Sequence, residues 1–328
     1  MYYHKVLQRT FFYSFLLLAG CGSRKEAEVR IGVGGQAQLI YLPALLAREL
    51  GFYKDAGLNV SLTEFQGGAK ALEAMMGGST DVVCGFYDHT IQMAAEGKDL
   101  RAFVAILRYP GVVLVSPDLT TIEALRGRIV GVTSLGSSSH MLVNYLLVTH
   151  GIKPEDVSNA AIGGGATAVG AVTHRKVDAA IMSDPALSIV RKQMPGLHVL
   201  ADLRTAEGVR SMFGVENYLA TVLYSKSGWV DQNRETAKKL AGAITRTLAW
   251  LSAQKPEQIR ERMPAAFRTD DVEMDLAVLR TLQGLLSSDG RFTPEAVEAV
   301  HKVLSTSLES VRNRKIDLSK TYTNELIP

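Results

Sequence analysis

Residues 67–75 read GGAKALEAM and lead to Asp81-Val82-Val83, and residues 164–172 read GGATAVGAV and lead to Asp178-Ala179-Ala180. Both the glycines and the aspartates of the two stretches are displaced by 97 residues. Each copy is a glycine-rich turn that opens a helix, then a polar break, then an acidic residue leading a short apolar strand. A chance match in an alanine-rich chain is the alternative, but the shared aspartate and register argue against it. A period this long does not fit a solenoid and predicts two similar α/β lobes.

The segments around this repeat alternate between strand and helix. The first half predicts strands at 29–33, 58–65, 81–85 and 102–107, with helices at 41–50 and 69–76. The second half predicts strands at 129–133, 157–162 and 178–182, with helices at 137–150 and 166–175. From residue 232 onward the pattern is nearly all helical. The fold class that we predict is therefore α/β, with two doubly wound lobes, a cleft between them and a helical C-terminal tail.

A basic start and a short apolar run precede Cys21. Lys5 and Arg9 come before residues 11–19, which read FFYSFLLLA. This run is shorter than the roughly 20 apolar residues that a membrane-spanning helix needs, and it is typical of a secretory signal. Residues 18–21, LAGC, resemble the bacterial lipobox, whose cysteine is acylated and becomes the N-terminus. We predict a signal peptide over residues 1–20 and a lipid-anchored linker over 21–28; an ordinary signal or a buried cysteine is the alternative.

The charge of the chain is nearly balanced. The full sequence carries a formal +3, and without Lys5 and Arg9 it has 34 basic and 33 acidic residues. This balance gives no reason to expect nucleic acid as a partner. Cys84 is the only cysteine besides Cys21, so the lipidated chain has no pair for an internal disulfide. The apolar neighbours of Cys84 predict a buried thiol, and we expect the chain to be a monomer.

The loop Gly136-Ser137-Ser138-Ser139 follows the predicted strand at 129–133 and opens a helix. Serine hydroxyls cap helix N-termini, and the free N–H groups and positive dipole end found there favour a bound anion. Ligands of α/β sheets bind at the carboxyl ends of the strands, where this loop lies. We predict that it holds an oxyanion such as a sulfonate or carboxylate; simple helix capping is the alternative.

Two further sets of residues are expected to border the same cleft. Gly68, Ala69 and Thr167 belong to the repeated strand-to-helix turns, where glycine lets backbone N–H groups approach a ligand closely. Gln38 and Tyr41 follow the first strand and are candidates for polar and aromatic contacts. Turn geometry alone is the alternative for the glycine turns. An exposed loop and a tyrosine in the helix core are the alternatives for Gln38 and Tyr41.

The strand that holds Cys84 is followed by Phe86-Tyr87-Asp88-His89-Thr90. Tyr87 and His89 are candidate ligand contacts, whereas Asp88 is interpreted as a cap of the next helix. Asp184, which precedes Pro185, has the corresponding place in the second half. An N-cap and a ligand contact are both open interpretations of Asp184.

Signatures of catalysis and of cofactor binding are absent from the sequence. It contains no Gly-x-Ser-x-Gly, His-Glu-x-x-His or Cys-x-x-Cys motif and no phosphate-binding P-loop. The turn at 32–35, GVGG, lacks the third glycine of a dinucleotide site because residue 37 is alanine. The seven histidines are scattered. We therefore predict no catalytic residues, no cofactor and no metal site.

Several short motifs are shared with one known family. They are YxP at 41–43, AxxxGFYKxxGLxV at 47–60, GGxxAL at 67–72, LRGRxVGV at 125–132, GSS at 136–138 and NxxxAxxxxGA at 233–243. Together they resemble the nitrate/sulfonate/taurine family of ABC transporter substrate-binding lipoproteins, over about residues 29 to 260. The cysteine-rich run of the thiamine-precursor branch is missing, which argues against that pyrimidine substrate.

The resemblance implies a type II periplasmic binding protein fold that closes like a hinge on its ligand. Hinge strands near 112–116 and 219–225 would divide the chain into lobe 1, residues 29–114 plus 221–328, and lobe 2, residues 115–220. The family holds an anionic head group at the turn 136–139, and the loops at Gln38, Gly68, Tyr87 and Asp184 would face it. Arg108 is the nearest candidate to neutralise an anion, with a surface charge as the alternative.

The lipobox, the two lobes and the absence of catalytic motifs predict a non-enzymatic protein that captures solutes for import. We expect the solute-binding component of an ABC importer, lipid-anchored on the periplasmic side of a bacterial membrane. Its partners would be a small-molecule ligand, a permease and an ATPase. An enzyme of the pyrimidine-precursor type on the same fold, and a ligand sensor that docks to a receptor, are the alternatives.

Overall fold

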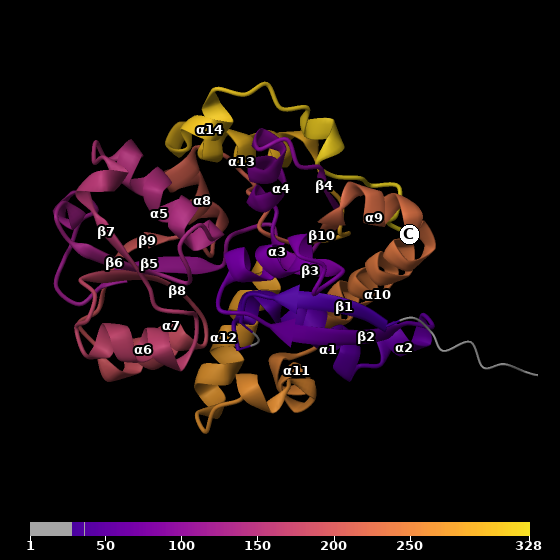
Figure 1. The fold of residues 1–328 in the computed structure, drawn as a ribbon. Coiled ribbons are helices and arrows are strands. Elements are labelled where there is room, and N and C mark those ends of the chain that lie inside the picture. Colours follow the sequence, from indigo (N-terminus) through magenta and orange to yellow (C-terminus); the bar gives the residue numbers. More distant parts are fainter. Residues whose placement is uncertain (1–27, 36) are drawn as a thin grey trace, which may run out of the picture.

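The computed structural model describes residues 28–35 and 37–328, so the predicted signal peptide and Cys21 lie outside the described residues. The described chain forms two five-stranded sheets, which lie side by side with helices around them (Figure 1). We call each sheet with its covering helices a lobe. Within the described ranges, no helix is long and apolar enough to cross a membrane.

The first sheet has the strand order β2-β1-β3-β10-β4. Its strands are β1 (Glu28–Val33), β2 (Asn59–Glu64), β3 (Val82–Phe86), β4 (Leu100–Ala105) and β10 (Thr221–Lys226). Strand β1 pairs in parallel with β2 and β3, whereas β10 runs antiparallel between β3 and β4. Cys84 lies in β3 and is fully buried, as its apolar neighbours predict.

The second sheet repeats this arrangement in the order β7-β6-β8-β5-β9. Its strands are β5 (Val112–Ser116), β6 (Ile129–Val132), β7 (Ser158–Ala161), β8 (Ala179–Ser183) and β9 (His198–Asp202). Strand β6 pairs in parallel with β7 and β8, and β5 runs antiparallel to β8 and β9. The two sheets therefore share one topology, and the prediction of two similar lobes is confirmed.

The repeated aspartates have the same structural role in both lobes. The N–H of Arg30 donates to the Asp81 carboxylate over 2.9 Å, and the N–H of Ile129 donates to Asp178 over 2.8 Å. The N–H groups of the two aspartates in turn donate to the carbonyl oxygens of Arg30 and Ile129. Each aspartate thus extends the parallel pairing of two adjacent strands, β1 with β3 in the first sheet and β6 with β8 in the second.

One strand of each sheet follows a crossing of the chain from the other lobe. The chain leaves the first sheet after Ala105 and enters the second at Val112, and it returns between Asp202 and Thr221. The entering strands β5 and β10 correspond to the two segments that we expected near the hinge. All of β5 pairs within the second sheet. This includes its first three residues, 112–114, which the expected boundary at 114 assigned to lobe 1.

Serines at the ends of these entering strands bind equivalent positions in the two lobes. The Ser116 hydroxyl donates to the carbonyl oxygen of Asp178 over 2.6 Å. The Ser225 hydroxyl donates to the carbonyl oxygen of Asp81 over 2.5 Å. The similarity of the lobes therefore extends to single side chains that the sequence repeat does not include.

Four helices accompany each sheet. Those of the first lobe are α1 (Leu42–Glu49), α2 (Phe52–Asp55), α3 (Gly68–Met76) and α4 (Asp88–Ala95). Those of the second are α5 (Ser138–Thr149), α6 (Ala166–Thr173), α7 (Ala186–Gln193) and α8 (Ala206–Phe213). Short 3-10 turns are η1 (Leu39–Tyr41), η2 (Glu123–Leu125), η3 (Pro154–Asp156), η4 (Ala265–Phe267) and η5 (Leu318–Lys320).

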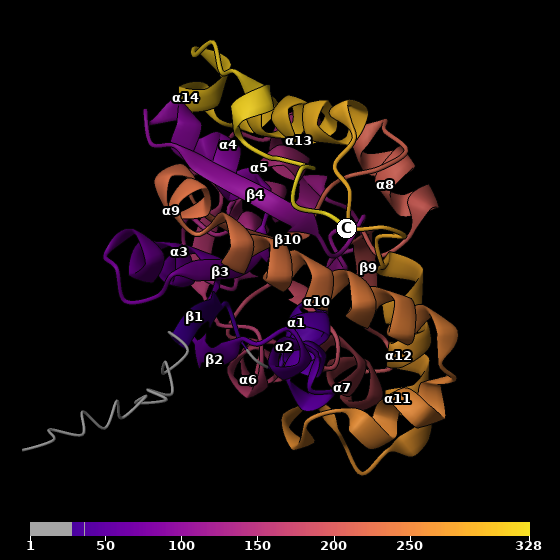
Figure 2. The same ribbon diagram turned by 90° about the vertical axis from the view of Figure 1, so that its right-hand side faces the viewer.

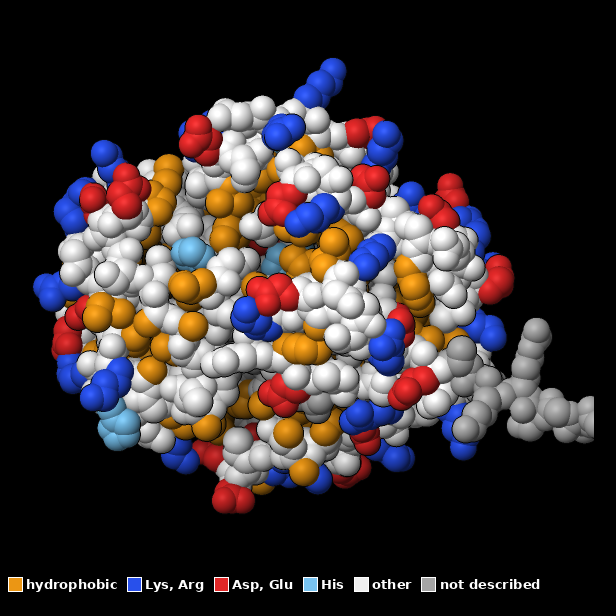
Figure 3. Space-filling model, in the orientation of Figure 1, with side chains coloured by type: hydrophobic (Ala, Val, Ile, Leu, Met, Phe, Trp, Pro, Cys, Tyr) orange, Lys and Arg blue, Asp and Glu red, His pale blue; other side chains and the backbone are white. Residues whose placement is uncertain are grey.

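The C-terminal part of the chain is helical, as expected, and joins the lobes. Its helices are α9 (Ser227–Gln232), α10 (Arg234–Ala253), α11 (Pro256–Arg262), α12 (Val272–Leu285), α13 (Pro294–Ser307) and α14 (Glu309–Arg312). Helix α10 packs on α1 and α2 of the first lobe, whereas α13 contacts both α4 and α5 (Figure 2). On the face seen in Figure 3, acidic and basic side chains are intermixed, in keeping with the balanced charge.

Candidate functional site

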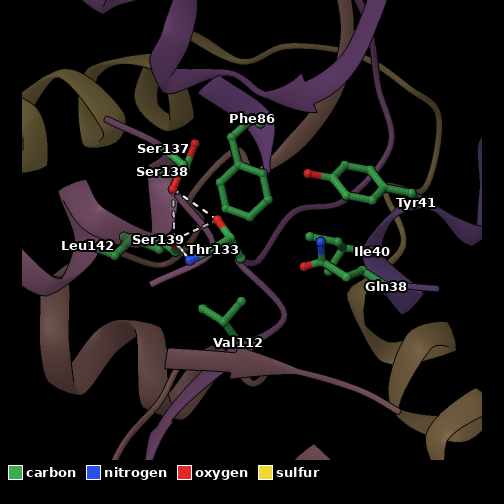
Figure 4. Close-up of a pocket in the computed structure, with 11 residues that line it drawn as sticks. Gln38, Ile40, Tyr41, Phe86, Val112, Thr133, Ser137, Ser138, Ser139 and Leu142 are labelled. Carbon is green, nitrogen blue, oxygen red and sulfur yellow. Dashed lines mark hydrogen bonds between the residues drawn. The ribbon is translucent and has the colours of Figure 1, made fainter. Parts of the chain in front are cut away.

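The loops at the carboxyl ends of the strands meet between the lobes and enclose a small cavity (Figure 4). Its volume is about 30 Å³, which is room for one or two water molecules. The residues that line it come from both lobes and are Gln38, Ile40, Tyr41, Gly68, Phe86, Val112, Thr133, Ser137, Ser138, Ser139 and Leu142. We call this the inner cavity.

A wider cleft of about 510 Å³ lies beside the inner cavity. Its walls include the two repeated turns, and Gln38 lines both spaces. The residues around this outer cleft are Gly34, Gly35, Ala37, Gln38, Glu64, Phe65, Gln66, Gly67, Gly163, Gly164, Gly165, Ala166 and Thr167. The outer cleft is of the size that a small organic molecule occupies.

The serine turn forms one wall of the inner cavity at the start of α5. Three hydroxyls bind one another, with Thr133 Oγ1 2.9 Å from the Oγ atoms of Ser137 and Ser139, which are 2.8 Å apart. Ser137 occupies the N-cap position, yet no described side chain caps the first turn of α5. Simple capping therefore does not account for these hydroxyls, and the first N–H groups of the helix have no side-chain acceptor.

Ser138 connects this wall to the opposite lobe. Its hydroxyl donates to Asp88 Oδ1 over 2.7 Å, and the Asp88 side chain is almost completely buried. Within the described residues Asp88 Oδ2 has no hydrogen-bond partner. Burial raises the pKa of Asp88, and the hydrogen bond from Ser138 acts in the opposite direction. Interpreting Asp88 only as a helix cap thus missed its contact across the cleft.

Gln38 and Tyr41 lie opposite the serine turn (Figure 4). The Gln38 amide donates to the carbonyl oxygen of Gly34 over 2.5 Å, and its oxygen accepts the Ser183 hydroxyl over 3.2 Å. Gln38 therefore binds both lobes. The N–H of Leu39 adds a second link, because it donates to the carbonyl oxygen of Asp184 over 2.8 Å. Tyr41 is buried, and burial raises the pKa of its hydroxyl well above the usual range.

The lobes approach one another most closely at the glycine turns. A Cβ atom added to Gly164 would lie 2.3 Å from Gln38 Cδ, and one added to Gly67 would lie 2.4 Å from Ser134 Oγ. Both distances are shorter than carbon and oxygen atoms tolerate without bonding. At these two positions glycine is needed for the close approach of the lobes, rather than for the turn alone.

His89 and Tyr87 are both fully buried, but they face different surroundings. His89 Nδ1 lies 2.9 Å from the Tyr224 hydroxyl, and a Cβ added to Gly68 would lie 3.1 Å from His89 Cε1. Burial lowers the pKa of His89 and favours the neutral ring. The Tyr87 hydroxyl instead bonds to Thr321, and its ring packs 5.8 Å from that of Phe292. Tyr87 therefore contacts the C-terminal tail and does not line the inner cavity.

The other predicted site residues lie at varying distances from the inner cavity. Asp184 Oδ1 accepts the N–H and the hydroxyl of Ser188, and Oδ2 lies 3.3 Å from Arg204, so its side chain is held within the second lobe. Thr167 is exposed and lines the outer cleft. Ala69 and Gly136 lie beside the serine turn but line neither space.

The cavity-lining residues that we did not single out are mostly apolar. They are Ile40, Phe86, Val112, Thr133 and Leu142. None of the inner-cavity residues is lysine or arginine. Arg108 is exposed and donates to the carbonyl oxygen of Gly284 over 3.3 Å, away from this cavity. In the described ranges, no group of three or more histidine, cysteine, aspartate or glutamate side chains could hold a metal ion.

Two lobes of one topology, each with an antiparallel strand that begins where the chain enters from the other lobe, define the periplasmic binding protein class. The chain belongs to the NMT1/THI5-like family, whose model matches residues 40–259. A protein structure from Bordetella bronchiseptica RB50 is 35% identical, with a TM-score of 0.87, over 92% of this chain and 96% of that one. The alkanesulfonate-binding protein SsuA from Xanthomonas axonopodis pv. citri, bound to MOPS, is 18% identical, with a TM-score of 0.66, over 91% of this chain and 98% of that one.

The curated relatives include a binding protein and an enzyme. Binding protein YtlA from Bacillus subtilis (strain 168) is 24% identical over 269 residues, 79% of this chain and 76% of that protein. The pyrimidine phosphate synthase THI11 from Saccharomyces cerevisiae is 25% identical over 145 residues, 42% of that enzyme. The resemblance to the sulfonate and nitrate binding proteins is thus confirmed. The chain therefore shares its fold with binding proteins of this kind.

Proposed function

We propose that the chain is the solute-binding component of an ABC importer and captures a small organic oxyanion between its lobes. The observation that carries this proposal is the uncapped start of α5 in the wall of the inner cavity. Its first N–H groups and the positive end of the helix dipole offer donors to a sulfonate or carboxylate. Phe86, Val112 and Leu142 provide apolar surface beside these donors. Because the inner cavity has room for only one or two water molecules, the rest of the ligand would extend into the adjoining outer cleft.

Closure of the lobes would retain the ligand. Links between the lobes at Ser138–Asp88, Ser183–Gln38 and Leu39–Asp184 support a closed state. The outer cleft would then be the route of entry when the lobes separate. A permease that recognises the closed lobes would receive the ligand as they open.

The lipid anchor is part of the same proposal. The residues LAGC at 18–21 support acylation of Cys21 and attachment to the periplasmic side of a bacterial membrane. Mass spectrometry of the protein from membranes should find Cys21 as an acylated N-terminus. The Cys21→Ser variant should lose the acyl chains and appear in the soluble fraction, and an unchanged membrane fraction would contradict the anchor.

A ligand screen tests the capture function. The purified protein should gain thermal stability with one small oxyanion and release the same molecule when it is denatured, because a ligand that binds the folded state stabilises it. Changing Ser137 and Ser138 to alanine should weaken binding of that molecule. The Ser79→Ala variant is the control because Ser79 is exposed and lies outside both spaces. Unchanged affinity after the double change would remove the oxyanion argument.

A second candidate function is an enzyme of pyrimidine synthesis, supported by the partial similarity to THI11. His89 would be the natural candidate for such chemistry because its Nε2 has no partner in the described structure. Incubation of the protein with a protein-free bacterial cell extract, followed by mass spectrometry, would test it. Formation of a pyrimidine phosphate that His89→Gln abolishes would favour the enzyme over the binding protein.

A further inference from the structure

The hydrogen bonds of the serine turn fix which way two hydroxyl protons point. Ser138 donates its proton to Asp88 Oδ1, and Ser137 donates to the carbonyl oxygen of Ser134 over 2.6 Å. A hydroxyl has a single proton, so each of these two oxygens is left with lone pairs only. The lone pairs of Ser137 face the Thr133 and Ser139 hydroxyls, whose oxygens lie 2.9 Å and 2.8 Å from its Oγ. Ser138 also lines the inner cavity and therefore presents an acceptor to it.

Asp88 adds a further acceptor directly behind Ser138. An ionised carboxylate only accepts hydrogen bonds, and Asp88 Oδ2 has no donor among the described residues. Asp88 is the first residue of α4 and faces the start of α5. The positive ends of both helices favour its charged form and so act against burial, which raises its pKa.

Capping of α4 is the simpler role for Asp88, but it does not explain these contacts. An acidic residue in a first turn stabilises its helix without a partner from another lobe. Here Oδ1 receives its hydrogen bond across the cleft, at a group that lines the cavity. The nearby buried ring of His89 does not satisfy Oδ2, because its Nδ1 lies against the Tyr224 hydroxyl and its Nε2 has no partner in the described structure.

We propose that Asp88 determines specificity by holding Ser138 as an acceptor, and that Ser138 receives a hydrogen bond from an N–H group of the ligand. The inference rests on the proposed capture function and sharpens it. The site selects a small molecule that carries an amino or amidine-like nitrogen over the same molecule without it. The N–H groups at the start of α5 remain available for an acidic group of that ligand.

Matched pairs of probes test this selection. We would measure the affinity of the full chain by calorimetry for 2-aminoethanesulfonate and ethanesulfonate, 3-aminopropanoate and propanoate, and 4-aminopyrimidine and pyrimidine. The aminated member of a binding pair should bind at least about 10-fold more tightly, as expected for one hydrogen bond to a charged group. The ligand released by the protein as purified should also contain such a nitrogen by mass spectrometry.

The Asp88→Asn variant tests whether the preference for aminated ligands depends on the Asp88 carboxylate. The amide introduced by this change lacks the charge and can donate to Ser138, so the preference for the aminated member should fall to about 1 or reverse. Glu295→Gln is the matched control because Glu295 is an exposed acidic residue in the first turn of α13. If the variant does not fold, the affinities of the unchanged protein for each pair of probes still test the proposal.

The outcomes separate this inference from the capture function. Equal or tighter binding of the deaminated members, or release of a nitrogen-free ligand, would overturn the role of Asp88 and leave capture intact. Binding of none of the probes, together with no released ligand, would overturn both.

Discussion

The hydroxyl of Ser138, the first residue of α5, donates a 2.7 Å hydrogen bond to Asp88, the first residue of α4, across the boundary between the lobes. A bond of this kind forms only when the lobes are closed, so its contribution belongs to the closed state alone. A buried carboxylate that loses its donor is costly, by about 1–3 kcal/mol. Opening the lobes lets water replace the lost donor.

Removing this hydroxyl should therefore shift the protein toward the open state. We expect Ser138→Ala to increase the radius of gyration of the ligand-free protein in small-angle X-ray scattering, while the far-UV circular dichroism stays unchanged. Ser79→Ala should leave the scattering curve as it is. A Ser138→Ala protein as compact as the unchanged chain would show that this bond does not hold the lobes together.

A methyl group at Gly164 should block closure directly. The added Cβ would lie 2.3 Å from Gln38 Cδ, and the φ angle of Gly164 is not in the left-handed region, so the backbone accepts alanine. We expect Gly164→Ala to weaken ligand binding by about 10-fold or more, since closure then costs repacking of Gln38.

A control variant and a rescue variant test whether the Gly164→Ala effect comes from the contact with Gln38. Gly170→Ala in α6 meets nothing within 4 Å and should leave affinity unchanged. Shortening Gln38 to alanine in the Gly164→Ala background should restore closure, measured by scattering with saturating ligand. If the double variant stays open, the contact with Gln38 is not the cause of the defect.

Phe86 and Tyr87 are neighbours in sequence but should affect different properties. Phe86 lines the inner cavity, so Phe86→Leu should weaken ligand binding several-fold with little change in the melting temperature. Tyr87 bonds to Thr321 in the tail, so Tyr87→Phe should lower the free energy of unfolding by about 1 kcal/mol and leave affinity unchanged. The opposite pattern would show that Tyr87, not Phe86, faces the ligand.

The pair Arg30–Asp81 should make stability depend on acid pH. Burial acts to raise the pKa of Asp81, but the hydrogen bonds and charge of Arg30 outweigh it, and the pKa is lowered. A folded-state pKa below the unfolded value of about 3.9 stabilises the protein above that pH. The stabilisation is then lost as the pH falls through the folded-state pKa. For this half-exposed pair it amounts to no more than about 1 kcal/mol.

Urea unfolding between pH 2 and pH 7 measures whether the stabilisation by Arg30–Asp81 is lost toward acid pH. Asp81→Asn should be less stable than the unchanged chain at pH 7, and the difference should shrink below about pH 4. Asp178→Asn is the comparison from the other lobe, because Arg128 lies 3.9 Å from Asp178 whereas Arg30 lies 2.7 Å from Asp81. Asp178→Asn should be closer in stability to the unchanged chain at pH 7 than Asp81→Asn is, and an Asp81→Asn difference that grows toward acid pH would contradict the assignment.

The two lobes could be predicted because the repeat is local. Glycine turns, apolar strands and the leading aspartates lie within about 20 residues of one another, so their order alone indicates the sheets. Strand β9 and helix α8 were not predicted; α8 is short and β9 is partly exposed, which weakens the apolar pattern that marks such elements.

The inner cavity was harder to predict than the sheets. Alternate side chains of a strand point to opposite faces. Which of Phe86 and Tyr87 faces the cavity therefore depends on the exact residue at which β3 ends. The role of Asp88 depends on Ser138, 50 residues away on the other lobe. The serine turn and Tyr41 were found because their local patterns mark a strand-to-helix junction, whereas pairings across the lobes leave no local signal.

The late position of β10 in the chain sets the order in which the protein can be completed on the ribosome. The second sheet is built from residues 112–202 without interruption, whereas the first lacks its fourth strand until β10 has been synthesised. Until then β3 and β4 both have an unpaired edge, the kind of surface that chaperones shield. The lobe that is translated first is thus the last to become complete.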